Sequence, residues 1–230
     1  MPSFFRKLGR SAAAECGVRF FGFSPDTKGN MARDEYEKPD FWSRKAFAEG
    51  YPARSVYKLA ELNGKFALFA KHARVLDLGA APGSWTLFAL RLVGERGQVA
   101  AVDMSPLSLK AAARNLVFIQ GNLYDSAVRG QAAALGPYHA VLCDAAPPTT
   151  GNRTADTARS LELAECAVGY AQDMLAPGGN FAVKLFQGGG ESALLRLLRE
   201  RFAGAKTCKP KACRSGSCET YAVGLGLKSN

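Results

Sequence analysis

Nine consecutive residues, Asp77 to Trp85, place the strongest constraint on how this chain can fold. They read Asp-Leu-Gly-Ala-Ala-Pro-Gly-Ser-Trp, and apolar runs lie on both sides of them, at residues 74–76 and 85–90. This order is typical of a buried strand, a tight turn and the start of a helix. Gly79 and Gly83 have no Cβ, so the backbone can bend sharply and a ligand can approach it closely. We predict a ligand-binding turn here; the alternative is that the glycines serve the turn alone.

A carboxylate further along the chain indicates the kind of ligand. Asp103 ends the next apolar run, residues 99–102, at the position where α/β folds bind the two hydroxyls of a ribose. The glycine spacing matches neither the dinucleotide fingerprint nor the phosphate-binding loop, and Pro82 removes one N–H donor. These features favour a nucleoside cofactor without phosphates, and S-adenosylmethionine is the common one.

Length and composition narrow the class of protein. The chain has 230 residues, of which 47% are hydrophobic, which suffices for one large domain with a substantial core. No apolar stretch reaches the roughly 18 residues that cross a bilayer, and no signal peptide is evident. Cysteines at positions 208, 213 and 218 do not match a zinc motif. We therefore predict unpaired thiols, no metal, no membrane contact and a cytoplasmic location.

The net charge of +10 is concentrated in two segments. Residues 44–74 hold seven Lys/Arg against two Asp/Glu, and residues 196–230 hold eight against two, so the remainder of the chain is close to neutral. Phosphates favour clustered cations, so this distribution predicts a nucleic-acid footprint. A solvated basic face is the alternative interpretation.

The pattern of apolar runs predicts how the chain is organised. Residues 1–40 are poorly periodic, and we expect a partly disordered N-terminal extension before a single domain at residues 41–230. Pro52 is predicted to open a helix that extends to about Phe66. Strands and helices then alternate, which indicates a Rossmann-like α/β fold with helices on both faces of a mostly parallel sheet. Five strands are expected near 74–79, 98–103, 116–120, 139–144 and 180–186, helices near 84–93, 106–113, 125–135, 155–175 and 191–202, and an antiparallel hairpin near 205–210 and 220–227, for seven strands in all.

Three more polar residues lie at the carboxyl ends of these predicted strands, where such sheets bind ligands. Asp144 ends the fourth strand, and Asn122 follows the third. Lys184 lies inside an otherwise apolar fifth strand, where an ammonium group is costly to bury unless it is paired or neutral. Its alternative role is a side chain that extends to solvent at the strand end.

From about Phe41 onward, the chain resembles the FtsJ/RrmJ family of ribose 2′-O-methyltransferases. Five segments carry the resemblance: residues 54–59, 77–85, 143–147, 183–188 and 218–221. It implies a class I S-adenosylmethionine-dependent methyltransferase domain and an RNA substrate. It also implies a Lys-Asp-Lys-Glu catalytic tetrad, which falls by motif on Lys58, Asp144, Lys184 and Glu219. The cofactor contacts that it implies fall on Gly83, Trp85, Asp103, Asn122 and Asp144.

Two positions depart from the family pattern. Ser84 replaces a usual second glycine, and Asn122 replaces a usual aspartate. An amide can still accept a hydrogen bond from an adenine amino group, so we expect cofactor binding to be retained but weakened.

The resemblance implies a reaction as well as a fold. We expect methyl transfer to a ribose 2′-hydroxyl in RNA, namely a uridine of 23S ribosomal RNA in the large subunit, by a monomeric enzyme with Lys184 as general base. Lys58 would position the ribose or a phosphate, and Glu219 would hold a lysine. Transfer RNA, an mRNA cap, a non-catalytic RNA-binding role and a nicotinamide-dependent oxidoreductase are the alternatives, although the glycine spacing and Pro82 argue against the last.

Overall fold

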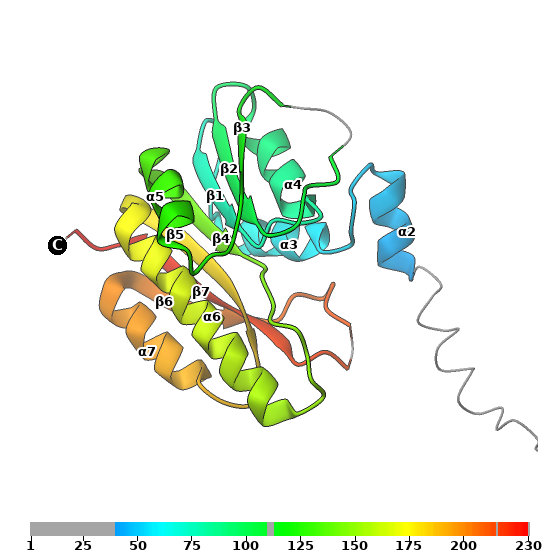
Figure 1. The fold of residues 1–230 in the computed structure, drawn as a ribbon, viewed down its shortest axis with the longest axis vertical. Helices are drawn as coiled ribbons and strands as arrows, with labels where there is room; N and C mark the ends of the chain where they lie inside the picture. The colour runs from blue at the N-terminus through cyan, green and yellow to red at the C-terminus, as the bar shows by residue number, and fades with distance from the viewer. Residues whose placement is uncertain (1–39, 110–112, 215, 230) are drawn as a thin grey trace, which may run out of the picture. The chain divides into compact units, whose positions relative to one another are not determined.

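Short apolar segments form the strands of a single mixed sheet (Figure 1). The computed structural model describes residues 40–109, 113–214 and 216–229. In these residues the strand order is β3-β2-β1-β4-β5-β7-β6, with β7 antiparallel to both of its neighbours and the other pairs parallel. The predicted seven-stranded, mostly parallel sheet is thus confirmed. The strands are β1 Arg74–Leu78, β2 Gln98–Asp103, β3 Leu116–Gln120, β4 Tyr138–Cys143, β5 Leu175–Phe186, β6 Phe202–Cys208 and β7 Glu219–Leu227.

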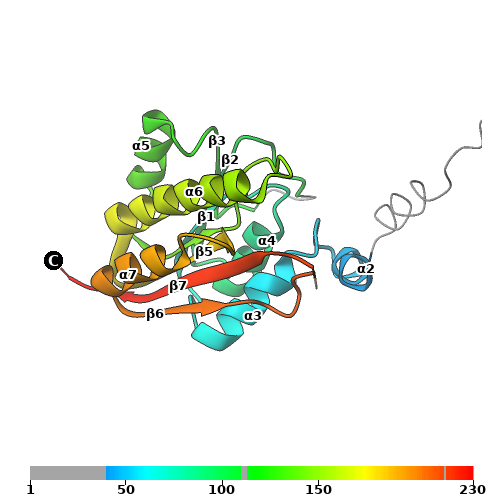
Figure 2. The same ribbon diagram turned by 90° about the horizontal axis from the view of Figure 1, so that it is seen from below.

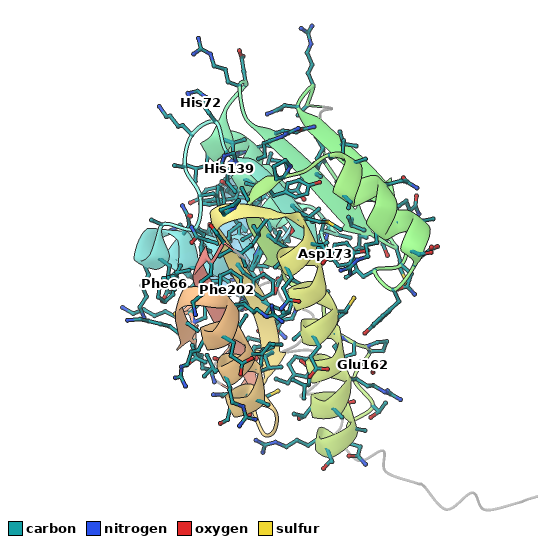
Figure 3. The ribbon with its side chains drawn as sticks, turned by 90° about the vertical axis from the view of Figure 1, so that its left-hand side faces the viewer. Phe66, His72, His139, Glu162, Asp173 and Phe202 are labelled. Atoms are coloured by element: carbon teal, nitrogen blue, oxygen red, sulfur yellow. The ribbon has the colours of Figure 1, made fainter. Side chains whose placement is uncertain are left out.

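Helices cover both faces of this sheet (Figure 2). Capping side chains start three of them: Asp40, Asp125 and Asn152 each accept a hydrogen bond from a backbone N–H of the first helical turn. The helices are α2 Phe41–Ala48, α3 Val56–Phe66, α4 Ser84–Val93, α5 Ser126–Ala134, α6 Arg153–Met174 and α7 Glu191–Arg201. Figure 3 shows α6 between α5 and α7, with Glu162 and Asp173 spaced along it.

Alternate residues along the strands separate the core into two clusters. Leu76, Val102 and Val183 pack beneath α5, α6 and α7. Val75 and Ala182 face the other way and pack with α3 and α4. Because successive side chains of a strand point to opposite faces, the parity of a residue decides which helices it meets. On β5 and β7, the side chains that lie an even number of residues from Ala182 and Val223, respectively, therefore face α3 and α4.

Three local predictions differ from the structure. Helix α2 was not predicted, and it forms because Asp40 caps it and Ala46 is completely buried. The helix expected near 106–113 is absent from its described residues, 106–109 and 113; there the Ser108 N–H donates to the Pro82 carbonyl at 2.9 Å and holds a loop. Strand β5 is expected near residues 180–186, but it begins at Leu175, directly after α6. The pairing of β4 with β5 shifts register between Tyr138 and Ala140, which accommodates the additional residues at the start of β5.

The remaining expectations about organisation concern the beginning of the chain. The predicted extension, residues 1–40, lies outside the described residues except for Asp40. The described residues that follow form one compact unit. Within them, no helix is both long enough and apolar enough to cross a membrane.

Candidate active site

The turn between β1 and α4 has the backbone conformation that its glycines suggest. Gly79 and Gly83 have φ angles of +71° and +111°, a region that other residues avoid. A Cβ on Gly79 would lie 2.4 Å from the Cβ of Ala145, and a Cβ on Gly83 would lie 2.7 Å from Cδ2 of Leu109. Contacts within the protein therefore already require both glycines. The turn also leaves the first backbone amides of α4 at the carboxyl edge of the sheet, where they can bind an anion.

A pocket of about 510 Å³ opens at this edge of the sheet. Four of the predicted cofactor residues line it: Gly79, Asp103, Asn122 and Asp144. Asp103 is fixed there because Oδ2 accepts from the Ala81 N–H at 2.9 Å and Oδ1 accepts from the Ser105 N–H at 2.7 Å. The size suits a nucleoside-sized ligand, and the lining combines apolar groups with a few polar ones, as in typical ligand sites.

Two other predicted cofactor residues, Gly83 and Trp85, do not line this pocket. The Trp85 ring is buried, its Nε1–H donates to the Ser55 carbonyl at 2.8 Å, and its centroid lies 5.8 Å from that of Tyr221. The side chain thus joins α4 to α3. The ring is therefore not available to a ligand of this pocket, whereas the backbone N–H of Trp85 belongs to the first turn of α4, whose amides have no partner within the helix.

Ser84, which departs from the family pattern, has a role that the sequence did not reveal. Its side chain is buried, and its Oγ accepts from the Ala53 N–H at 2.7 Å and donates to the Ala53 carbonyl at 3.0 Å. These two bonds join the start of α4 to the segment before α3.

Strand parity brings the charged residues together. Lys184 lies two positions after Ala182, and it pairs across the ladder with Tyr221. Glu219 lies two positions before Tyr221, so all three side chains face α3. Helix α3 presents Lys58 from its buried side, and Asp144 follows the end of β4. The predicted tetrad is therefore assembled from four segments on one face of the sheet.

Short contacts connect these side chains. Lys184 Nζ donates to the Asp144 carbonyl at 2.5 Å and lies 3.2 Å from Asp144 Oδ1. The Tyr221 hydroxyl donates to the same Oδ1 at 2.6 Å. Lys58 Nζ donates to Glu219 Oε2 at 2.7 Å. Asp144 thus lines the pocket and also contacts the predicted base, which places the two predicted functions side by side.

Electrostatics fix the charge of the Lys58–Glu219 pair. Burial lowers the pKa of Lys58, but the charges of Asp144 and Glu219 and the hydrogen bond outweigh it, so the pKa is raised overall. Burial raises the pKa of Glu219, but the Lys58 hydrogen bond and charge outweigh that effect and lower it. Burial, followed by the charge of Asp144, raises the pKa of Tyr221 well above its ordinary value, so its hydroxyl remains a donor.

Asp77, at the end of β1, is a second buried carboxyl near the site. It is completely buried, and its Oδ2 accepts from the Thr86 hydroxyl at 2.6 Å, while Oδ1 has no hydrogen-bond partner among the described residues. Burial raises its pKa to about 7, and the charges of Asp144 and Asp103 act in the same direction. The sequence placed Asp77 in the turn motif but gave no reason to expect this environment.

The two basic segments meet beside α3. The Lys211 N–H donates to Glu61 Oε2 at 2.8 Å, and Arg54 Nη2 donates to the Ala212 carbonyl at 2.5 Å. The loop before β7 therefore lies against α3, next to the Lys58–Glu219 pair. Among the described residues there is no cluster of three metal-ligating side chains, and the cysteines there are unpaired.

Comparison with known proteins gives consistent matches. The family model described as FtsJ-like methyltransferase matches residues 51–227. The ribosomal RNA large subunit methyltransferase E of Treponema denticola is 54% identical over 198 residues, which is 86% of this chain and 100% of that protein. The protein of the same name from Nitratidesulfovibrio vulgaris is 45% identical over 193 residues, 83% of this chain and 96% of that one. A crystal structure of a ribosomal RNA methyltransferase from Plasmodium falciparum is 27% identical, covers 78% of this chain and 100% of that chain, and has a TM-score of 0.67.

Proposed function

The chain belongs to the family of FtsJ-like methyltransferases, and we propose that it transfers a methyl group from S-adenosylmethionine to a ribose 2′-hydroxyl of ribosomal RNA. The target that we propose is a uridine of the large subunit. One observation carries the proposal: Asp144 joins a nucleoside-sized pocket to a cluster of two lysines and a glutamate. The pocket supplies a place for the donor, and the cluster supplies groups that can handle a hydroxyl and its proton.

The pocket residues fit S-adenosylmethionine. The Asp103 carboxylate would accept hydrogen bonds from the ribose hydroxyls, and Asn122 would contact the adenine. The first amides of α4, including that of Trp85, would bind the amino-acid carboxylate, because a helix start combines free N–H groups with a favourable dipole. Pocket size and donor chemistry thus support this cofactor. When bound, it supplies a methyl group that is already activated on a sulfonium.

The chain's own residues would then align the hydroxyl and remove its proton. Alignment of two reactants can itself contribute a large part of a rate enhancement. Lys184, held by Asp144, would accept the 2′-hydroxyl proton at Nζ, which requires a neutral amine in the reacting complex. The Tyr221 hydroxyl fixes the other side of Asp144 through Oδ1. Asp144 would therefore orient the base from within the cofactor pocket.

Lys58 and Glu219 would have a different task. The raised pKa of Lys58 and the lowered pKa of Glu219 keep both groups charged at neutral pH, so Lys58 is unsuited to accept a proton. Instead, it would position the ribose or a neighbouring phosphate, with Glu219 holding the ammonium group in place. The basic loop against α3 would hold the RNA backbone, since phosphate contacts set position without selecting sequence.

We propose that residues 41–230 form the methyltransferase domain and that it acts as a monomer. A cytoplasmic location agrees with the five unpaired cysteines among the described residues.

The test is methyl transfer from radiolabelled S-adenosylmethionine to large ribosomal subunits from a strain that lacks this modification. Free ribosomal RNA and bulk transfer RNA are assayed in parallel. A methylated 2′-oxygen cannot attack the adjacent phosphate, so label on a ribose resists alkaline cleavage of the RNA chain at that nucleotide, whereas label on a base does not prevent cleavage.

We expect label in the large subunit, in an alkali-resistant dinucleotide that contains uridine. Label in transfer RNA alone would contradict the proposed substrate and retain the chemistry. Label in an alkali-labile position would contradict ribose methylation. Absence of transfer to all three substrates, with S-adenosylmethionine bound, would contradict the proposed function.

A further inference from the structure

Helix α2 and the segment after it present aromatic side chains that the proposed chemistry does not use. Phe41 and Phe47 are 63% and 54% exposed, and both belong to α2. Three half-buried aromatic side chains adjoin them: Trp42 contacts Phe41 and Tyr57, with ring centroids 5.4 Å and 5.0 Å apart, and Tyr51 lines a hollow together with Phe47. We call these five side chains the α2 patch. Large exposed apolar groups that lie together are unusual on a protein surface and mark interaction sites.

The α2 patch includes a hollow as well as a surface. A pocket of about 430 Å³ lies between α2, the segment that follows it (residues 50–52), α4 and the loop after β2. Phe47, Tyr51 and Pro52 line one side, and Leu87, Arg91 and Leu109 line the other. The hollow thus has an aromatic wall and one cationic group, and it is separate from the pocket that holds Asp103.

Cations are interleaved with these rings. Lys45 Nζ lies 5.7 Å from the centroid of Trp42 and 5.0 Å from that of Tyr57, and the Arg91 guanidinium lies 4.3 Å from the centroid of Tyr51. Arg44 is exposed on α2, and the only acidic residue between positions 41 and 58 is Glu49. A second copy of this chain would bring like charges together at this surface. An anionic partner with flat aromatic groups matches it, and RNA has both properties.

The α2 patch is connected to the catalytic cluster through neighbouring residues. Tyr57, which contacts Trp42 with centroids 5.0 Å apart, directly precedes Lys58. Arg54 pairs with Asp40 at the start of α2 and also reaches the loop before β7. In Figures 1 and 2, α2 lies beyond the end of α3. A strand of RNA whose ribose contacts Lys58 can therefore continue along this surface.

We propose that the α2 patch binds an unpaired nucleotide next to the methylated one. Its base stacks on Phe47 in the hollow, and Arg44 and Lys45 bind the adjoining phosphates. This inference rests on the proposed RNA methyltransferase function and extends it. It implies that the enzyme recognises a target with at least one unstacked neighbour, because a base within a helix cannot reach the ring.

The test compares Phe47→Ala, Phe47→Leu and Phe47→Trp in the full chain. RNA affinity is measured by fluorescence anisotropy with a short fluorescein-labelled single-stranded RNA of mixed sequence that contains uridine, and methyl transfer is measured on large ribosomal subunits. Val117→Ala, at an exposed position on β3, is the matched truncation. Phe47 is exposed, so the variants are expected to fold, and thermal unfolding and S-adenosylmethionine affinity verify this.

We expect Phe47→Ala and Phe47→Leu to bind RNA about 5- to 30-fold more weakly, because base–aromatic stacking is typically lost in this range. Phe47→Trp, which retains a ring, should stay close to the wild type. Arg44→Ala with Lys45→Ala should also reduce the dependence of affinity on salt, by about one unit of slope per lost phosphate contact. Substitution of Arg199 and Arg201 on α7 by alanine should leave the salt dependence of RNA affinity unchanged.

The results separate this inference from the proposed function. If the wild type methylates RNA and all Phe47 variants bind and methylate it within twofold, the inference is rejected. If Phe47→Leu retains full affinity, apolar contact and not stacking is responsible, which also rejects the proposed stacking. If the wild type methylates no RNA, the proposed function itself fails.

Discussion

On one side of Asp144, strands β1 to β4 hold the cofactor pocket; on the other side, β5, β7 and helix α3 hold the charged cluster. The first side uses backbone amides, two glycines and single polar groups at strand ends. The second side uses charged side chains that contact one another across three elements. Asp144 belongs to both, so in the proposed reaction it would connect binding of the donor with activation of the acceptor.

The two sides therefore differ in what holds their functional groups in position. The pocket rests on a closely packed turn, in which Gly79 and Gly83 leave no room for a Cβ beside Ala145 and Leu109. A cluster of charges is rigid only if its members hold one another, since an unpaired buried charge is costly. Changes on the two sides should therefore affect different measurements.

The largest effect is expected from Lys184→Ala. A general base typically contributes about 10²–10⁴-fold in rate, so methyl transfer should fall by that factor while the affinity for S-adenosylmethionine stays within about threefold. Lys184→Arg should be as inactive as Lys184→Ala, because a guanidinium does not accept a proton at neutral pH. Single-turnover transfer and calorimetry measure the two quantities.

Lys206→Ala on the edge strand β6 removes an exposed lysine and is the control. Transfer that persists within about tenfold in Lys184→Ala would show that Lys184 is not the base. An active Lys184→Arg would assign it an electrostatic role instead.

Asp103→Ala tests the other side of the comparison. Loss of hydrogen bonds to a charged group should weaken S-adenosylmethionine binding by about 10- to 100-fold. The rate at saturating cofactor should change much less, because the catalytic cluster is untouched. Calorimetric titration gives the affinity, and unchanged binding would contradict the ribose contact. Asp103→Asn, which retains one acceptor for the backbone N–H groups, separates loss of the turn from loss of the ligand contact.

Asp77→Asn tests whether the turn depends on a desolvated carboxyl. The folded-state pKa of about 7 lies above the ordinary 3.8, so the folded protein retains a proton that the unfolded chain releases. The stability that this proton supports is fully present below pH 3.8 and is lost as the pH rises to about 7. The variant lacks this loss, so its stability relative to the wild type should rise by about 1–3 kcal/mol between pH 5 and pH 8.

Urea unfolding at the two pH values measures the change. Asp173→Asn, at an exposed carboxyl on α6 (Figure 3), should show no such dependence. An equal pH response in both variants would contradict the role assigned to burial at Asp77.

Glu219→Gln should give the smallest effect on stability. The pKa of Glu219 is lowered in the folded protein, so its charge stabilises the fold above the ordinary pKa of 4.5. This contribution is lost as the pH falls through the lower pKa of the folded state. The raised pKa of Lys58 means that its contribution is present below 10.5 and is lost only as the pH rises through its folded value. At pH 7 the pair is fully charged, and removal of one charge should cost about 1–2 kcal/mol.

Unfolding of Glu219→Gln is compared with that of the wild type at pH 7 and at pH 4, where the difference should shrink. An equal difference at both values would show that the charge of Glu219 does not stabilise the fold.

The extent to which the sequence predicted the molecule follows the same division. The segment from β1 through α4 was predicted to within one residue, because strand, turn and helix signals are contiguous there. The neighbours of Lys184 could not be derived in this way, since they come from residues 144 and 221 and meet only through the register of β4, β5 and β7. The family resemblance supplied the tetrad, but it did not reveal the contacts of Tyr221.

Other gaps have particular physical causes. The apolar pattern near residues 106–113 suits a helix, yet the Ser108–Pro82 bond and the contact of Leu109 with Gly83 favour a loop in the described part. Asp77 reads as an ordinary polar residue of the turn motif, because burial depends on the packing of α4 against β1. Tyr221 could have been noticed from spacing alone, since it lies two residues after Glu219 on a strand and so shares its face.

The position of β7 in the sheet also bears on the order in which a newly made chain can assemble its charged cluster. Among the described residues, strand β6 pairs with β7 alone, and β7 lies between β5 and β6 although it is synthesised after both. While residues 219–227 are still inside the ribosome, the emerged chain has both lysines and Asp144 but neither Glu219 nor Tyr221. The charged cluster that we propose to be catalytic can therefore close only after β7 has left the ribosome and paired with β5.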